Sequence, residues 1–277
     1  MKYSPKEVKD INEKFNFNFK KKFGQNFIID ENIINKIVDK SNIDSKSLVV
    51  EIGPGGGSLT NKLSLTAKNV LCYEIDEQLK PILEEQFKNK TNVDVIYQDF
   101  LKANLAKDIE KYSYEKLYVI ANLPYYITTP IIIKLIESKV CIDKIIVMVQ
   151  KEVGERFSAS IGSKNYGSLT VFLNYYFNIS KIANVSRHVF IPVPNVDSVV
   201  VLFEPKSNLI KARNEDHFFE LVRKSFRQKR KTLKNNLREY DLEIVEKVLE
   251  KRGESLNTRA EALPLDFYVE LSNELSD

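Results

Sequence analysis

The stretch Leu48-Val49-Val50-Glu51-Ile52-Gly53-Pro54-Gly55-Gly56-Gly57-Ser58-Leu59-Thr60 decides the fold of this chain. Its apolar first part predicts a buried strand, the glycines predict a tight turn, and the pattern from Ser58 onward predicts a helix. Glycines at such a turn let a ligand approach the backbone closely. We therefore predict a ligand site at the end of this strand, with Gly53 and Gly55 among its residues.

Further strand-like runs follow this stretch, at 70–74, 93–97, 117–121 and 144–149. They alternate with helical patterns, which predicts a parallel sheet with helices on both faces. The last two runs, roughly 176–185 and 198–203, have no long helix between them, and we expect an antiparallel pair at one edge. The pattern predicts an α/β protein with a Rossmann-like class I methyltransferase fold, built on a seven-stranded, mostly parallel sheet.

The chain changes character after Glu204-Pro205-Lys206. From about Asp216 onward its pattern is helical and rich in Lys and Arg. We predict a large domain over residues 1–205 and a small all-helical domain over residues 206–277, a division that suits a chain of 277 residues.

Acidic residues end the second and third strand-like runs. Glu74 follows the first glycine by about 20 residues, where a carboxylate typically binds ribose hydroxyls. Asp99 can accept a hydrogen bond from the amine of an adenine. The glycines are bunched and interrupted by Pro54, unlike the spacing that suits a pyrophosphate. We expect a ligand that carries adenosine without a pyrophosphate, such as S-adenosylmethionine, although a plain glycine turn with two surface carboxylates is the alternative.

Asn122-Leu123-Pro124-Tyr125 follows the fourth run. The Asn122 side-chain oxygen and the Leu123 carbonyl can each accept one hydrogen of an exocyclic amine such as adenine N6, which directs the nitrogen lone pair at an electrophile. Pro124 stiffens the turn and has no N–H. Tyr125 offers a face on which a flipped base can stack. A proline-terminated strand followed by a core aromatic residue is the alternative.

A proline-rich segment, Phe190-Ile191-Pro192-Val193-Pro194, leads into the last strand-like run. Phe190 either stacks on the opposite face of the base held by Tyr125 or belongs to the core, and the sequence leaves both interpretations open.

Basic residues gather in two places. No acidic residue lies between Leu221 and Arg238, and we predict one helix over 216–239 with a row of cations able to hold phosphates: Arg223, Arg227, Arg230 and Lys234. Lys21 and Lys22, next to aromatic residues, form the second cluster. A solvated charged face is the alternative interpretation of both.

The composition limits the classes of protein to which the chain can belong. The chain carries a net charge of +4, with 43% hydrophobic and 29% charged residues, as in ordinary globular proteins. It has no run of ~18 apolar residues and no apolar leader, so we expect a cytoplasmic protein without a membrane partner. Cys72 and Cys141 lie in apolar runs and are expected to be buried free thiols. The scattered His and Cys residues predict no metal site.

In these motifs the chain resembles the ribosomal RNA adenine dimethyltransferases, above all their small-subunit branch of the KsgA (RsmA) type. The resemblance extends from Lys21-Lys22-Phe23-Gly24-Gln25-Asn26-Phe27 to Phe226-Arg227-Gln228-Lys229-Arg230-Lys231-Thr232-Leu233. One departure is Gly56-Gly57, where the family often has bulkier residues, and we expect it to loosen the turn.

The resemblance implies dimethylation of N6 on two adjacent adenosines near the 3′ end of 16S rRNA in the small ribosomal subunit, and a role in subunit maturation. It also implies which residues bind S-adenosylmethionine: Asn26, Ile28, Gly53, Glu74, Asp99 and Asn122.

Other functions remain open. One is a large-subunit rRNA adenine N6-methyltransferase of the macrolide-resistance type, although these typically carry Ile in place of Leu123. A DNA adenine methyltransferase would need a separate target-recognition domain. A non-catalytic RNA-binding assembly factor would not need the acidic and Asn positions. We expect a monomer.

Overall fold

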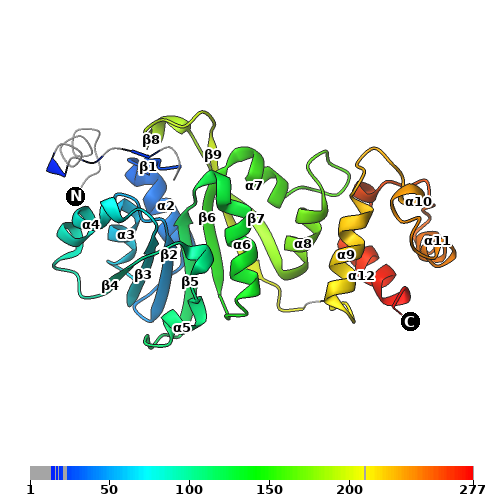
Figure 1. Ribbon diagram of the computed structural model, residues 1–277, viewed down its shortest axis with the longest axis horizontal. Helices are drawn as coiled ribbons and strands as arrows, with labels where there is room; N and C mark the ends of the chain where they lie inside the picture. Colours follow the sequence, from blue (N-terminus) through cyan, green and yellow to red (C-terminus); the bar gives the residue numbers. More distant parts are fainter. Residues whose placement is uncertain (1–13, 16, 18, 21–23, 209, 277) are drawn as a thin grey trace. The chain divides into compact units, whose positions relative to one another are not determined.

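The computed structural model describes residues 14, 15, 17, 19, 20, 24–208 and 210–276 (Figure 1). Lys21 and Lys22 lie outside these residues. The chain divides into two compact units, Met1–Gly154 with Ser180–Glu204, and Glu155–Ile179 with Pro205–Asp277. The second unit thus contains the C-terminal region and also Glu155–Ile179, a segment that the sequence analysis assigned to the first domain.

A seven-stranded sheet in the order β4-β3-β2-β5-β6-β9-β7 confirms the predicted fold. The strands from β4 to β6 are parallel to their neighbours, and β9 pairs antiparallel with β6. The order reverses between β2 and β5, and ligands of open α/β sheets bind where this happens, at the carboxyl ends of the strands. The strands are β2 (Ser47–Ile52), β3 (Asn69–Glu74), β4 (Val93–Tyr97), β5 (Lys116–Asn122), β6 (Lys144–Gln150), β7 (Phe177–Val185) and β9 (Ser198–Pro205).

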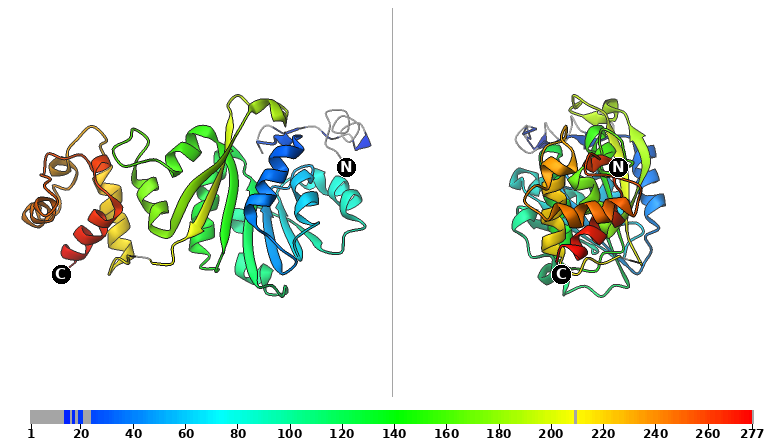
Figure 2. Two further views of the ribbon diagram at one scale, coloured as in Figure 1. Left: turned by 180° about the vertical axis from the view of Figure 1, so that it is seen from behind. Right: turned by 90° about the vertical axis from the view of Figure 1, so that its right-hand side faces the viewer.

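Helices cover the sheet on both faces. Helix α6 lies in front of the sheet in Figure 1, and α2 lies in front of it in the reverse view of Figure 2. This double cover explains why all six residues of β2 are buried. The helices of this part of the chain are α2 (Glu31–Ser41), α3 (Ser58–Leu63), α4 (Lys80–Phe87), α5 (Leu105–Ile109), α6 (Thr128–Glu137) and α7 (Lys151–Phe157).

A separate two-stranded sheet joins the N-terminal motif to the proline-rich segment. Strand β1 (Phe27–Ile28) pairs antiparallel with β8 (Phe190–Ile191), so that Ile28 lies opposite Phe190. This pairing places the N-terminal residues beside the carboxyl edge of the main sheet, because the backbone of Ile28 also accepts a hydrogen bond from Ser58 at 3.2 Å.

The second unit is helical and has its own core, in which Phe218, Leu221 and Phe267 are fully buried. The predicted helix over 216–239 is wrong: α9 ends at Ser225 because the Asn236 side chain donates to the Ser225 carbonyl at 2.7 Å. The helices are α8 (Ser168–Tyr176), α9 (Glu215–Ser225), α10 (Leu233–Asn236), α11 (Leu242–Glu250) and α12 (Leu265–Glu274).

The cysteines differ in their exposure. Cys72 is a buried free thiol in β3, as expected, whereas Cys141 is exposed. The prediction for Cys141 is wrong because β6 begins only at Lys144, so this residue lies in the loop before the strand. Within the described part of the chain, no helix is both long and apolar enough to cross a membrane.

Candidate active site

One pocket lies at the carboxyl ends of β2, β3 and β5 and brings together most residues that the sequence singled out. Its walls also include Ile75, and Glu51 and Ser58, whose positions in the sequence had not indicated a place in the site. The predicted residues that line it are Asn26, Ile28, Gly53, Gly55, Glu74, Asn122, Leu123, Pro124 and Tyr125.

The glycine turn has a geometry that only glycine adopts readily. Gly53, Gly55 and Gly57 have φ angles of 72°, 55° and 82°, in the left-handed region. A Cβ on Gly55 would lie 2.8 Å from the Phe27 ring. The N–H of Gly57 donates to the Pro54 carbonyl at 2.8 Å, which closes the turn. The turn therefore presents a compact backbone surface to the pocket.

Glu74 ends β3 and is almost fully buried. Its carboxylate accepts hydrogen bonds from the backbone N–H groups of Asp76 at 2.8 Å and Gly55 at 3.3 Å. Burial raises the pKa of Glu74 to about 7, against the opposing effect of these hydrogen bonds, and the charge of Asp76 raises it further. Near neutral pH this side chain therefore exists in both the charged and the neutral form.

Glu51 is a second acidic residue in the pocket wall, and it is completely buried in β2. Burial raises its pKa to about 8, although hydrogen bonds from Thr60 and Cys72 oppose the shift. Its carboxyl group is thus mostly protonated at neutral pH. A charged residue within an apolar strand, directly before a glycine turn, is the sequence signal that could have identified it.

The N-terminal segment is fastened beside the pocket by Asp76. Lys20 Nζ and Gln25 Nε2 lie 2.7 and 2.8 Å from the two carboxylate oxygens of Asp76. The segment then contributes Asn26 and Ile28 to the pocket wall. Gln25 and Asp76 therefore support the site, a role that their positions in the sequence did not indicate.

Asn122 has a defined orientation at the end of β5. Its Nδ2 donates to the backbone carbonyl of Asn26 at 2.9 Å, so Oδ1 remains as an acceptor. The next residue, Leu123, donates its N–H to the Met148 carbonyl at 3.1 Å. In the described part of the chain, neither Asn122 Oδ1 nor the Leu123 carbonyl is recorded as accepting a hydrogen bond. Two neighbouring acceptors thus lie in the pocket wall, as an exocyclic amine requires.

Tyr125, Phe190 and Asp99 differ in their relation to the pocket. Tyr125 lines it and is partly buried. Phe190 is fully buried in the core beside Ile28, which agrees with the alternative interpretation, and stacking on a base would require its ring to become exposed. Asp99 is not among the lining residues, and its side chain accepts from the Leu101 N–H at 3.0 Å and caps a short helix. Roles for both in binding stay predictions.

S-adenosylmethionine fits the chemistry of this pocket. The glycine turn leaves room for a ligand against the backbone at Gly53, where an added Cβ would meet, among the described residues, only Pro124 Cδ, at 3.9 Å. Glu74 offers a carboxylate to a ribose, and the neighbouring Ile75, which is 39% exposed, offers an apolar surface to a purine. Asn122 and Leu123, which also line the pocket, offer acceptors that suit the amine of a second adenine.

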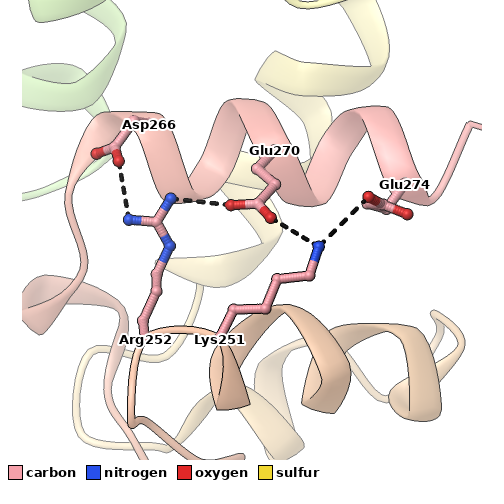
Figure 3. Close-up of polar contacts among 5 residues, drawn as sticks. All are labelled: Lys251, Arg252, Asp266, Glu270 and Glu274. Carbon is pink, nitrogen blue, oxygen red and sulfur yellow. Dashed lines mark hydrogen bonds and ion pairs between the residues drawn. The ribbon is translucent and has the colours of Figure 1, made fainter.

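Two groups of cations in the second unit differ in their partners. In the first, Lys251 and Arg252 bind carboxylates of α12, with Arg252 2.8 Å from Asp266 and Lys251 3.0 Å from Glu270 (Figure 3). In the second, Arg223 and Arg230 are exposed and have no ion pair in the described part of the chain. The second group is available to hold phosphates without losing an existing partner.

The predicted basic row is therefore not a single helix face. Arg223 lies on α9 and Lys234 on α10, whereas Arg227 and Arg230 lie in the turns between them. Arg227 is 3.9 Å from Glu239, and both side chains are largely exposed, so this pair is weak. All four cations remain exposed in a short stretch, which keeps them as candidates for binding RNA.

Comparisons with known proteins concern the chain as a whole rather than single residues of the site. A family model described as ribosomal RNA adenine dimethylase matches residues 16–277. The ribosomal RNA small subunit methyltransferase A of Staphylococcus aureus is 45% identical over 280 residues, covering 98% of this chain and 94% of that protein.

Two solved structures are similar as well. A dimethyladenosine transferase from Plasmodium falciparum has a TM-score of 0.74 at 28% identity, covering 88% of this chain and 95% of that one. The 23S rRNA methyltransferase ErmE also has a TM-score of 0.74, at 26% identity, covering 91% of this chain and all of that one.

Proposed function

Because the chain belongs to the ribosomal RNA adenine dimethylase family, we propose that it methylates N6 of two adjacent adenosines near the 3′ end of 16S rRNA. Its general activity, the S-adenosylmethionine-dependent dimethylation of adenosine in ribosomal RNA, follows from the family. The observation that supports the residue assignments best is the orientation of Asn122, whose Nδ2 is engaged by Asn26 while Oδ1 remains for the substrate amine.

The residues of the pocket act by positioning and polarisation. S-adenosylmethionine supplies an electrophilic methyl group when it is bound. Asn122 Oδ1 and the Leu123 carbonyl accept the hydrogens of N6, which favours a pyramidal nitrogen with its lone pair directed at that methyl group. Tyr125 stacks on the base and keeps it in the pocket. Holding two reactants in this way lowers the barrier without a general base.

A second methylation of the same nitrogen uses the same two acceptors. After the first transfer, N6 keeps one hydrogen, which can bond to either Asn122 Oδ1 or the Leu123 carbonyl. The proton lost from the alkylated nitrogen passes to water, since this nitrogen is acidic immediately after attack. The pocket therefore needs room for one methyl group rather than a new catalytic residue.

Small-subunit rRNA is the substrate that the comparisons favour. The protein named as a small-subunit enzyme shares 45% identity with this chain, whereas ErmE, named as a 23S enzyme, shares 26%. The fold does not separate the two substrates, because ErmE and the dimethyladenosine transferase have the same TM-score. A monomeric state, a cytoplasmic location and a role in subunit maturation stay predictions.

A competition experiment tests this choice. Unmethylated small and large ribosomal subunits are offered together with S-adenosylmethionine that carries a labelled methyl group, and each rRNA is then isolated and digested to nucleosides. We expect label in N6,N6-dimethyladenosine from the small-subunit rRNA. Label mainly in the large-subunit rRNA would replace the proposal with the macrolide-resistance type of activity.

Cofactor affinity should depend on pH through Glu74. Its pKa is raised to about 7, so the carboxylate that accepts from the ribose is present above this pH and is lost below it. We expect the affinity for S-adenosylmethionine, measured by calorimetry, to fall roughly tenfold between pH 8 and pH 6, which is the change in the ionised fraction of one group with this pKa.

Two variants distinguish the effect of Glu74 on the pH dependence of cofactor affinity from that of Glu51, the other buried acid. Glu74→Gln should bind the cofactor weakly at both pH values and show a flat profile. Glu51→Gln should keep most of the fall between pH 8 and pH 6, because Glu51, whose pKa is raised to about 8, is mostly protonated up to pH 7 and only about half ionised at pH 8. A wild-type affinity that does not change with pH would disprove the ribose role of Glu74.

Exposed cations of the second unit should determine how RNA binding responds to salt. We expect Arg223→Ala with Arg230→Ala to weaken binding to small subunits and to flatten the plot of log affinity against log salt by roughly 0.7–0.9 per lost phosphate contact. Lys251→Ala with Arg252→Ala is the matched control, since it removes the same charge from residues already paired with carboxylates. Equal slopes for the two double variants would mean that Arg223 and Arg230 do not contact phosphates.

A further inference from the structure

Ser198 connects the proline-rich segment to the active-site pocket. It is the first residue of β9 and is fully buried. Its Oγ lies 2.7 Å from the hydroxyl oxygen of Tyr125, which lines the pocket. The stretch from Phe190 to Ser198 thus contacts a pocket residue through Ser198, whereas Phe190 itself is in the core.

The position of Ser198 is fixed by its surroundings. It pairs with Gln150 in the ladder between β6 and β9. The preceding residue, Asp197, accepts the backbone N–H of Lys151 at 3.0 Å through its carbonyl, and its side chain accepts the N–H of Arg187 at 3.0 Å. Ser198 is therefore a rigid partner for Tyr125.

The Tyr125 ring needs a side-chain partner to fix its orientation, because this residue does not lie in a strand of the sheet. It begins a short 3-10 helix, Tyr125–Ile127, directly after Pro124, and no residue of this helix is fully buried. Within the described part of the chain, the Tyr125 hydroxyl makes one hydrogen bond, to Ser198. Stacking on a base uses the face of the ring and does not involve the hydroxyl, so this group is available to orient the ring.

We propose that Ser198 is a positioning residue for methyl transfer, which holds the Tyr125 ring so that a stacked adenine presents N6 to Asn122 and Leu123. The inference rests on the proposed function, because it assumes that Tyr125 stacks on the substrate base. It assigns Ser198 an effect on the rate of transfer rather than on binding, since a ring that can rotate still contacts RNA but holds N6 less often in the reactive orientation.

A double-mutant cycle on single-turnover methylation of unmethylated small subunits tests this inference. Tyr125→Phe and Ser198→Ala should each slow the transfer step roughly fivefold to tenfold, the effect of one hydrogen bond of ordinary net strength. The double variant should be no slower than either single variant, because both changes remove the same interaction. The affinities for S-adenosylmethionine and for small subunits should stay at wild-type values.

Ser47→Ala is the matched control for the loss of a buried serine. Ser47 is also fully buried at the start of a strand, and its hydroxyl donates to Asp44 at 2.7 Å, outside the pocket. This variant should lose thermal stability but keep the wild-type rate of transfer.

Three outcomes would count against the inference or the proposed function. A wild-type rate for Tyr125→Phe would overturn the inference, and this variant decides the matter even if Ser198→Ala does not fold. Additive effects in the double variant would also overturn it. If the wild-type protein transfers no methyl group to small subunits, the proposed function itself fails. This result differs from the first two, which overturn only the role of Ser198.

Discussion

Replacing Asn122 with Ala is expected to slow methyl transfer to small-subunit rRNA about 10²–10³-fold. The reason is the loss of one of two acceptors that polarise N6 in a closed site, and removal of a comparable polar group in other enzymes raises the barrier by ~2.7–4 kcal/mol. The Leu123 carbonyl would remain, but a single acceptor does not fix the direction of the lone pair. Single-turnover rates with saturating S-adenosylmethionine measure this effect separately from binding.

Asn92→Ala provides the control for the loss of an Asn side chain. Asn92 Nδ2 donates to the Ser64 and Ala67 carbonyls at 2.9 and 3.2 Å, outside the residues that line the pocket, so its replacement should affect stability and leave the transfer rate near that of the wild type. Affinity for small subunits should be unchanged in both variants. Wild-type turnover by Asn122→Ala would contradict the acceptor role.

Gly55→Ala is expected to abolish cofactor binding at concentrations that saturate the wild-type protein. Its φ of 55° costs about 1–2 kcal/mol for a residue with a Cβ. The added atom would also lie 2.8 Å from the Phe27 ring, and overpacking of this kind typically costs ~1–3 kcal/mol. Relief of the contact must displace either Phe27 or the glycine turn, and the residues on both sides of Phe27 line the same pocket.

Gly162→Ala is the control that measures the effect of a Cβ at a positive φ without a steric contact. Gly162 has a φ of 78°, and a Cβ there meets no atom within 4 Å. This variant should lose a small amount of stability and bind S-adenosylmethionine normally in calorimetry. Phe27→Leu should partly restore binding to Gly55→Ala if the contact with the ring causes the loss. Normal cofactor affinity of Gly55→Ala would show that the ligand does not approach this turn.

The sequence predicted the sheet and the pocket well because both depend on local patterns. Runs such as Leu117 to Ala121 are apolar throughout, which is typical of strands covered on both faces, and parallel strands place their following residues at a common edge. Glu74 and Asn122 therefore had to lie near the glycine turn once the strands had been identified. The hydrogen bond from Asn122 to Asn26, 96 positions apart, could not be read from either motif.

The sequence was less informative where a tertiary contact decides the outcome. The helix predicted over 216–239 ends at Ser225 because Asn236 bonds to its carbonyl, and no local breaker marks this position. Cys141 lies in an apolar run but precedes the strand. The burial of Phe190 and the bond between Ser198 and Tyr125 both depend on how the proline-rich segment packs on the sheet.

Mapping the methylated nucleosides tests the central claim most directly. Small subunits that lack the modification are incubated with the protein and S-adenosylmethionine, and the fragment from the 3′ end of the 16S rRNA is analysed by mass spectrometry. We predict two adjacent adenosines that each gain two methyl groups on N6 with wild-type protein, and little or no gain with Asn122→Ala. Methyl groups on another atom or in another region of the rRNA, or equal gains with both proteins, would contradict the proposed function and its site.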